Sequence, residues 1–470
     1  MLAVALVVST EPARYLEAWN GPPAPGLVDL KPLPAPPGGR PGVAVLLVDG
    51  LGRAPARKLT KLKALRAAGA DVQLTAAYPS KSRPAYITLL TGLPTQLHGG
   101  RNNRTPGGHG LDTFLHRAKD AGLGTACVGD RIGWFAELAG GGCESSKTTL
   151  TDPEFVRAAS DALASDARVV VLHWLGVDWM GHQSGGASGE YGAAARDADT
   201  LVGMVRDRAG GRTVVVVADH GHSPRGGHGG DEPGVMEVPL ILYGPGVVAG
   251  AKPSAQAHDV AATLSVLAGA AVPAASIGEP IWDALDPALK AERKDHADAV
   301  IARATRPEHT LPKSGAAWPA VRLVLAALLV VLAVRPRPTW ALVGALTPLL
   351  AVLLLSGRGD PLTLSAVDQA PRFVSRLLGY SGPAAVFGAL ALIRSTDATR
   401  DASLKAIAFA AGAVGPWLIA CGWAGFRPYP AVPTPIGGFL PVALAIPAVV
   451  GLFAAALAIP IAAWRNDAQP

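Results

Sequence analysis

The chain has 470 residues, enough for two or three domains. Its net charge of +6 is modest, and no run of Lys and Arg is dense enough for a nucleic-acid surface, so nucleic acid is not an expected partner. Cys127, Cys143 and Cys421 are too few for a disulfide framework. Cys127 and Cys143 could pair in an oxidising compartment, but the sequence alone favours unpaired thiols.

The composition changes near residue 315. Before this point charged residues are spread among apolar strands, and beyond it they gather in short clusters between long apolar runs. The first part is therefore predicted to be a soluble unit and the second a membrane domain. We expect an N-terminal segment and linker at 1–42, a globular domain at 43–285, a connector at 286–316, and a transmembrane domain of about five helices at 317–465.

The N-terminal segment begins with a short apolar run, Leu2–Val8, which has no basic residue before it and is too short for a signal peptide with its cleavage site. Two interpretations stay open, the remnant of a longer anchor and the buried start of a strand. We expect an upstream in-frame extension that encodes a further apolar stretch. Pro and Gly then crowd residues 21–42, which predicts a linker.

From residue 43 onward, apolar β-branched runs alternate with helix-prone segments. Strands are expected at Val43–Val48, Val72–Ala77, Thr125–Val128, Arg168–His173 and Thr213–Ala218, and helices at Arg53–Ala68, Pro84–Leu90, Leu111–Ala121 and Ala193–Arg208. Continuous apolar strands separated by helices are typical of a parallel sheet buried on both faces. The predicted fold class is α/β, a sandwich with a mostly parallel central sheet.

Long apolar runs follow the connector and predict an all-α transmembrane bundle. They lie at 317–334, 339–356, 378–393, 405–425 and 437–464, with lengths near the roughly 20 residues that a bilayer core requires. The last run is long enough to tilt, or to break at Pro447 or Pro460.

Basic residues between these runs predict the orientation of the bundle. One expected side carries Arg335, Arg337, Arg394, Arg400, Lys405 and Arg465, and the other carries Arg358, Arg372, Arg376 and Arg427. Because basic loops tend to stay in the cytoplasm, the richer side is assigned there. The sequence thus predicts a multi-pass integral membrane protein with its globular domain on the extracytoplasmic side.

Acidic and imidazole side chains follow the expected strands at the edge where an α/β sheet presents its ligand-binding groups. Asp49 ends the first strand in VAVLLVDG, and Asp219 and His220 end another in VVVVADHG. An Asp-Gly by itself after a strand is usually a turn, and an Asp-His by itself usually has no special role. Their occurrence at two equivalent strand ends favours a site.

A second set of ligand-type residues lies in two loops. Asp178 and His182, after the strand ARVVVLHWLG, have a spacing that brings both side chains to one ligand on a helical turn. His222 and His228 lie farther along, the latter in the Gly-rich loop GGHGGDE, which could also be an ordinary flexible loop. Together these carboxylates and imidazoles are a suitable ligand set for two divalent cations.

The candidate nucleophile is Ser82 in AAYPSKSRPAYITLLTG, where a strand ends and Ser82-Arg83-Pro84 opens a helix. Local evidence alone favours a plain N-cap role for this serine. A helix N-terminus is also well suited to receive a phosphate, and coordination to a divalent cation makes a serine hydroxyl nucleophilic.

The ordered motifs VDG, SKSRPAYITLLTG with LHG, LGVDWMGHQSG, ADHG and GGHGG resemble the alkaline phosphatase superfamily, in particular its nucleotide pyrophosphatase and phosphodiesterase branch. The resemblance covers residues 43 to about 270 and implies an alkaline phosphatase-like sandwich. LDTFLHRAKDAGLGTACVGDRIGWFAEL and LGVDWMGHQSG are most similar to the glycosylphosphatidylinositol (GPI) ethanolamine phosphate transferases, which also carry membrane spans. QAHDVAATLSVLAGAAVP resembles the helix that closes the domain in these enzymes.

This resemblance implies roles for individual residues. The implied ligands are Asp49, Ser82, Asp219 and His220 for one metal ion, and Asp178, His182 and His228 for the other, with His222 as the substitute for His228. Asn103 matches the position whose amide helps to hold the phosphoryl oxygens. The chain departs from these families in its serine, where threonine is usual, in the charged Arg83 after it, and in a shorter membrane region. Arg83 leaves the substrate headgroup open.

The predicted function is a metal-dependent phosphoryl-group transferase, phosphoethanolamine-transferase-like, or a phosphodiesterase, acting at the membrane surface through a covalent phosphoserine-type intermediate. We expect two divalent metal ions, with zinc the best match for mixed imidazole and carboxylate ligands and manganese or magnesium as alternatives. The expected substrate is a phospholipid or another phosphodiester. The alternatives are a membrane-tethered nucleotide-type phosphodiesterase or phosphatase and, more distantly, a non-catalytic transport or scaffold protein. A sulfatase is disfavoured because Tyr86 stands where C-x-P-x-R requires Arg.

Overall fold

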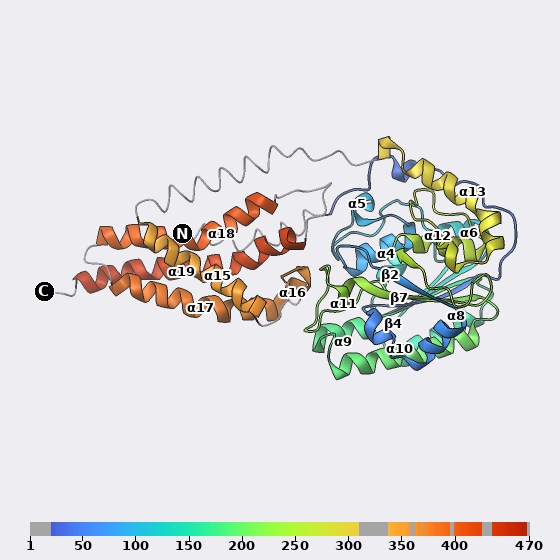
Figure 1. Ribbon diagram of the computed structural model, residues 1–470, viewed down its shortest axis with the longest axis horizontal. Coiled ribbons are helices and arrows are strands. Elements are labelled where there is room, and N and C mark those ends of the chain that lie inside the picture. The colour runs from blue at the N-terminus through green and yellow to red at the C-terminus, as the bar shows by residue number, and fades with distance from the viewer. Residues whose placement is uncertain are drawn as a thin grey trace. The chain divides into compact units, whose positions relative to one another are not determined.

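The computed structural model describes residues 20–309, 337–357, 362–368, 370–394, 399–424 and 435–467. These residues form two compact units, one up to residue 309 and one from residue 337 onward, and we describe each by itself (Figure 1). The predicted span at 317–334 and the apolar run Leu2–Val8 lie outside the described residues.

An eight-stranded sheet forms the centre of the first unit, with the strand order β4-β3-β5-β1-β6-β7-β2-β8. The strands are β1 Val43–Val48, β2 Ala70–Thr75, β3 Thr125–Asp130, β4 Ser145–Thr149, β5 Val169–Trp174, β6 Thr213–Val217, β7 Glu237–Tyr243 and β8 Ser254–Gln256. Only β7 runs antiparallel to its neighbours among these strands. The predicted fold class, α/β with a mostly parallel sheet, is confirmed.

Helices cover both faces of this sheet, which explains why every residue of β1, β5 and β6 is buried (Figure 1). Helices α4, α6 and α12 pack together on one face, and α3, α8 and α10 lie on the other. The helices are α2 Arg53–Ala56, α3 Thr60–Ala68, α4 Ser82–Thr91, α5 Thr95–His98, α6 Phe114–Asp120, α7 Trp134–Leu138, α8 Asp152–Ala164, α9 Gly176–Ser184, α10 Gly189–Arg208, α11 Pro233–Met236, α12 Asp259–Ala268 and α13 Pro287–Ala304, with 3₁₀ turns at Leu27–Asp29, Trp282–Ala284 and Pro307–His309.

Differences from the sequence prediction include three strands, one helix break and the helix α8, which was not expected. Strands β4, β7 and β8 were not predicted; β4 is an edge strand with the sequence SSKTT, of which only Thr149 is buried, so it has no apolar pattern. The helix expected over Arg53–Ala68 is two helices, because Leu59 is extended and α3 begins anew after it. A long-range cap from Asp199 of α10 stabilises this second start.

Cys127 of β3 and Cys143 form a disulfide, so the expectation of unpaired thiols is wrong. The cause is tertiary, since β3 and β4 pair in parallel with Cys127 opposite Ser146, and this register brings the two Cα atoms to 5.8 Å. The disulfide closes the segment that contains α7.

The second unit is a bundle of apolar helices, as predicted. It contains α15 Pro338–Gly357, α16 Leu364–Asp368, α17 Ala370–Arg394, α18 Thr399–Ala424 and α19 Pro435–Asp467. Four of its described helices are long and apolar enough to cross a membrane, over Pro338–Ser356, Arg372–Arg394, Asp401–Ala420 and Phe439–Ala462. They match the last four predicted spans, and α19 continues through Pro447 and Pro460 without a break.

Small residues allow the helices of this bundle to approach closely. A Cβ atom on Gly412 of α18 would lie 1.9 Å from the carbonyl oxygen of Ala341 on α15. A Cβ atom on Gly344 of α15 would lie 2.0 Å from the carbonyl oxygen of Phe409. The backbones of α15 and α18 therefore pack in direct contact, as is common where lipid supplies no hydrophobic driving force between helices.

We predict that Asp199→Ala destabilises the first unit by about 1–3 kcal/mol, because the buried Asp199 carboxylate accepts hydrogen bonds of 2.9 Å from the backbone N–H groups of both Lys61 and Leu62. Urea unfolding of the full chain in detergent, followed by tryptophan fluorescence, measures the change. Asp199→Asn retains an acceptor and should cost less. A loss below about 0.5 kcal/mol for the alanine variant would contradict the capping role.

Candidate active site

Three adjacent parallel strands, β5, β1 and β6, bring acidic residues to one edge of the sheet. Asp49 directly follows β1, Asp219 lies two residues after the end of β6, and α9, which carries Asp178, begins two residues after β5. All three carboxylates are buried. The parallel register thus gathers residues that are up to 170 positions apart (49 to 219).

The first ligand group consists of Asp49, Asp219 and His220. His220 Nε2 lies 3.6 Å from Asp49 Oδ1 and 3.3 Å from Asp219 Oδ2. Within the described part of the chain, both of these buried carboxylate oxygens lack a hydrogen-bond partner. Because buried polar atoms are normally satisfied, two unpartnered oxygens facing one imidazole nitrogen fit a divalent cation.

The electrostatics of this group also favour a cation. Burial, reinforced by the neighbouring Asp49 carboxylate, raises the pKa of Asp219 well above its usual value. Burial lowers the pKa of His220. His220 Nδ1 lies 3.2 Å from the carbonyl oxygen of Gly221, which assigns the proton to Nδ1 and leaves the Nε2 lone pair directed at the carboxylates. A neutral imidazole of this tautomer is suited to bind a metal ion.

The second ligand group lies around Asp178 on α9. His182 Nε2, one helical turn later, is 3.4 Å from Asp178 Oδ2, and His222 Nε2 is 2.8 Å from Asp178 Oδ1. Burial opposes ionisation of Asp178, but hydrogen bonds from His182 and His222 hold its pKa well below the usual value. His228 Nε2 lies 3.3 Å from His182 Nε2. Both His222 and His228 are therefore within reach of this group.

The two groups are contiguous. The rings of His220 and His228 stack with centroids 3.7 Å apart and an angle of 11° between their planes. Asp178, His220 and His228 themselves form a cluster that could hold an ion. The structure therefore brings all the predicted metal-ligand side chains into one continuous, largely buried region.

Ser82 lies at the edge of the first ligand group, with its Oγ 3.2 Å from His220 Nε2. It is the first residue of α4 and follows the N-cap residue Lys81, so the N-cap role that local evidence favoured is wrong. Asn103 lies beside it, because the Asn103 Oδ1 atom accepts the backbone N–H of Arg83 at 3.1 Å. The hydroxyl thus faces the candidate ligands instead of capping its helix.

The charged residue after Ser82 is held within the protein. Arg83 forms a two-pronged ion pair with Glu137 of α7, at 2.8 and 3.0 Å, and its Nε donates to the carbonyl oxygen of Thr105 at 2.7 Å. Its guanidinium carbon lies 5.4 Å from the centroid of the Trp134 ring. Glu137 therefore compensates the positive charge of Arg83, the residue because of which the sequence left the identity of the substrate headgroup open. The same contact lowers the pKa of Glu137.

Sequence reasoning missed two residues that contact Asp49. The Tyr86 hydroxyl on α4 hydrogen-bonds to Asp49 Oδ2 and lies 2.9 Å from His173 Nε2, and His173 of β5 lies 3.1 Å from the same carboxylate oxygen. Weak signals were present. Tyr86 is one helical turn after Ser82, and His173 interrupts an otherwise apolar strand.

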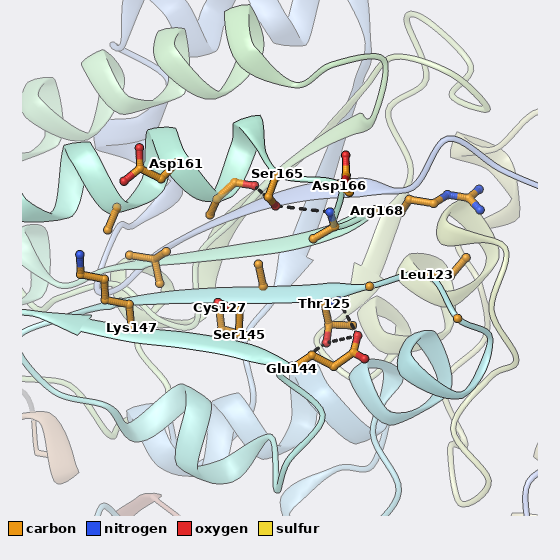
Figure 2. A pocket seen from close by; sticks show the side chains of 17 residues that line it. Leu123, Thr125, Cys127, Glu144, Ser145, Lys147, Asp161, Ser165, Asp166 and Arg168 are labelled. Atoms are coloured by element: carbon orange, nitrogen blue, oxygen red, sulfur yellow. Dashed lines mark hydrogen bonds between the residues drawn. The ribbon is translucent and has the colours of Figure 1, made fainter.

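A cavity of about 680 Å³ lies elsewhere in the first unit (Figure 2). Gly124, Ser145 and Arg168, which line it, stand at the amino ends of β3, β4 and β5, and α8 forms another wall. Figure 2 shows Thr125 and Glu144 hydrogen-bonded to each other at its edge. Because the ligand groups lie at the carboxyl ends of the strands, this cavity is not part of the candidate site.

We predict that His98 makes the first unit acid-sensitive. Burial, with minor effects of His109 and Arg101, lowers the pKa of His98 from 6.5 to about 3, while its ring nitrogens contact Thr88 Oγ1 at 3.0 Å and the N–H of Gly100 at 3.1 Å. The pKa of His98 is lower in the folded than in the unfolded chain, so the unfolded chain binds more protons between pH 6.5 and 3. The free energy of unfolding should therefore fall as the pH drops from 6.5 towards 3, by up to roughly 4 kcal/mol.

Urea unfolding at pH 7, 5 and 4 measures this dependence, with His98→Gln as the comparison because glutamine cannot titrate. The variant should lose less stability than the wild type over that range. Equal losses would contradict the assignment.

Comparisons with known proteins agree with the expected relationship. The model of the family "Type I phosphodiesterase / nucleotide pyrophosphatase" matches residues 134–232. GPI ethanolamine phosphate transferase 2, catalytic subunit, of Homo sapiens is 29% identical over 234 residues, which cover 44% of this chain and 23% of that protein. GPI ethanolamine phosphate transferase 1 of Neurospora crassa is 34% identical over 155 residues, which cover 26% and 15% respectively.

The matched part of the chain therefore spans less than a quarter of the length of these two transferases. Among solved structures, murine ectonucleotide pyrophosphatase/phosphodiesterase 5 is similar with a TM-score of 0.41 and 14% identity, covering 49% of this chain and 96% of that one. The family-model match contains Asp178, His182, Asp219, His220 and His228, while Asp49 and Ser82 lie outside it.

Proposed function

We propose that this chain is a metal-dependent phosphoryl-group transferase or phosphodiesterase. Our premise is that it is a membrane-protein relative of the phosphodiesterase/nucleotide pyrophosphatase branch of the alkaline phosphatase superfamily. Its matched relatives are named for phosphodiester cleavage and for ethanolamine phosphate transfer. The proposed substrate is a phospholipid or another phosphodiester at the membrane surface, and the proposed reaction passes through a covalent phosphoserine-type intermediate.

One observation carries the proposal, namely the Ser82 hydroxyl at 3.2 Å from an imidazole that faces two unpartnered buried carboxylate oxygens. We assign Asp49, Ser82, Asp219 and His220 to one divalent ion, and Asp178, His182 and His228 to the other. His222 is the alternative ligand in the second group, since it lies 2.8 Å from Asp178. Zinc suits this set best, with manganese or magnesium as alternatives.

The mechanism assigns each protein group a task. Divalent ions bound by the two groups would lower the pKa of the Ser82 hydroxyl and neutralise charge on the transferred phosphoryl group. Ser82 Oγ attacks the phosphorus, its bond to phosphorus forms, and the bond to the leaving alcohol breaks. Asn103 orients the phosphoryl oxygens, and the start of α4 supplies a favourable dipole. Water or an acceptor alcohol then takes the phosphoryl group from Ser82.

We predict that Ser82→Ala lowers turnover on the order of 10³-fold or more, because it removes the attacking oxygen while six of the seven assigned ligands remain. Elemental analysis should find nearly unchanged divalent metal in the variant. Ser80→Ala is a matched control, since Ser80 has a buried hydroxyl that bonds to the Gly230 carbonyl at 2.7 Å. Turnover of the Ser82 variant within about threefold of the wild type would exclude this nucleophile.

The assay uses two substrates in parallel, phosphatidylethanolamine in vesicles and a soluble chromogenic phosphodiester. Cleavage of the lipid with transfer to an added alcohol favours the transferase. Release of free phosphate ester from either substrate, without transfer, favours the membrane-tethered hydrolase.

We also propose that the first unit faces the extracytoplasmic side. The Cys127–Cys143 disulfide supports this placement, because disulfides persist in oxidising compartments. Arg337 at the start of α15 forms a 2.7 Å ion pair with Asp401 near the start of α18. This contact supports placing the basic loop before α15 and the basic loop before α18 on the same side of the membrane.

Single cysteines in a Cys421→Ser background test this orientation. Ala164→Cys lies at an exposed position at the end of α8, and Thr396→Cys lies between α17 and α18. An impermeant thiol reagent applied to intact cells should label position 164 and not 396. The reverse pattern would overturn the orientation.

A further inference from the structure

The two oxygens of the Asp49 carboxylate have opposite surroundings. Oδ2 contacts the Tyr86 hydroxyl and lies 3.1 Å from His173 Nε2. Oδ1 has no hydrogen-bond partner among the residues that the structure describes and lies 3.6 Å from His220 Nε2. The side chains of Asp49, Tyr86 and His173 are all buried, so bulk water does not make the surroundings of the two oxygens alike.

The hydrogen-bond roles follow from the chemistry of the three groups. A carboxylate oxygen accepts hydrogen bonds, so the Tyr86 O–H donates to Oδ2. The His173 Nε2–H, which lies 3.1 Å from Oδ2 and 2.9 Å from the Tyr86 oxygen, is shared between these two acceptors. The Nε2–H tautomer of His173 is assigned from this network, and its buried Nδ1 has no hydrogen-bond partner in the described ranges. Two donors on one oxygen fix the rotation of the carboxylate and aim Oδ1 at the first ligand group.

Tyr86 also connects this carboxylate to the nucleophile. It follows Ser82 by four residues on α4, so both side chains lie on the same face of the helix. The Tyr86 ring packs edge-on against His173 and Phe135, with centroid distances of 4.9 and 5.9 Å. Packing therefore holds the ring in place and fixes the position of its hydroxyl beside Asp49.

We propose that Tyr86 and His173 are positioning residues that preset the Asp49 carboxylate for one of the two divalent ions. This inference rests on the proposed function, because it presumes that Asp49 is a ligand. Without the Tyr86 hydroxyl, Oδ2 keeps a single donor and the carboxylate can rotate, so the ion held by Asp49, Asp219 and His220 should bind more weakly. Groups that orient ligands in this way typically change metal affinity 10- to 100-fold.

The test is a pair of matched variants of the full chain in detergent, Tyr86→Phe and Tyr191→Phe. Each deletes one buried hydroxyl and keeps the ring. The Tyr191 hydroxyl donates to the Gly50 carbonyl at 2.6 Å and accepts from the Gly52 N–H at 3.1 Å, so it holds the loop after β1 without contacting a carboxylate. Zinc affinity is measured by competition with a chromogenic chelator, which resolves two binding steps.

Tyr86→Phe should weaken one zinc ion about 10- to 100-fold and leave the other nearly unchanged, whereas Tyr191→Phe should weaken neither to that extent. The melting temperatures of the metal-free variants report any general loss of folding. Wild-type affinity for both ions in Tyr86→Phe, or an equal loss in Tyr191→Phe, would overturn the inference and leave the proposed function standing. Wild-type protein that binds none of zinc, manganese and magnesium would overturn the proposed function itself.

Variants of His173 provide an independent check. His173→Leu removes the second donor and should weaken the same ion as Tyr86→Phe does. His173→Gln retains an N–H group and should restore part of the affinity relative to His173→Leu. Equal zinc affinity of these two variants would show that the donor to Asp49 has no positioning role.

Discussion

The organisation of the first unit depends on the burial of three neighbouring carboxyl groups at one edge of its sheet. Asp49, Asp178 and Asp219 are all buried, and burial, reinforced by the neighbouring Asp49 carboxylate, raises the pKa of Asp219 well above its usual value. At Asp178, hydrogen bonds from His182 and His222 outweigh the cost of burying the carboxylate and hold its pKa well below the usual value. The unpartnered oxygens of the other two carboxylates remain uncompensated within the described residues, which is the physical reason to assign a cation there.

Helix α4, which carries the candidate nucleophile Ser82, is fixed to this cluster by contacts along its first turn. The Ser82 hydroxyl faces His220, the backbone N–H of Arg83 donates to Asn103, and the Arg83 guanidinium holds Glu137 of α7. The disulfide closes the segment that contains α7, so this segment is restrained from both ends. Reactions that need atoms aligned within fractions of an ångström benefit from such preorganisation.

The second unit follows different physics. Its helices are apolar along most of their length, and close backbone contacts at Gly344 and Gly412 take the place of a hydrophobic driving force. Charge is concentrated near helix ends, where Arg337 and Lys405 both pair with Asp401. The four described spans are long and apolar enough to cross a membrane.

The sequence alone determined the strand and helix alternation, the apolar spans and the ligand-type residues at strand ends, because these depend on local periodicity and residue chemistry. It did not determine which residues meet. The disulfide needed the β3–β4 register, the break before α3 needed Asp199 from α10, and the pairing of Arg83 with Glu137 needed α7 beside α4. The contacts of Tyr86 and His173 with Asp49 likewise join three elements. Only tertiary packing decides such contacts, because their partners are separated by tens of residues and no local pattern encodes them.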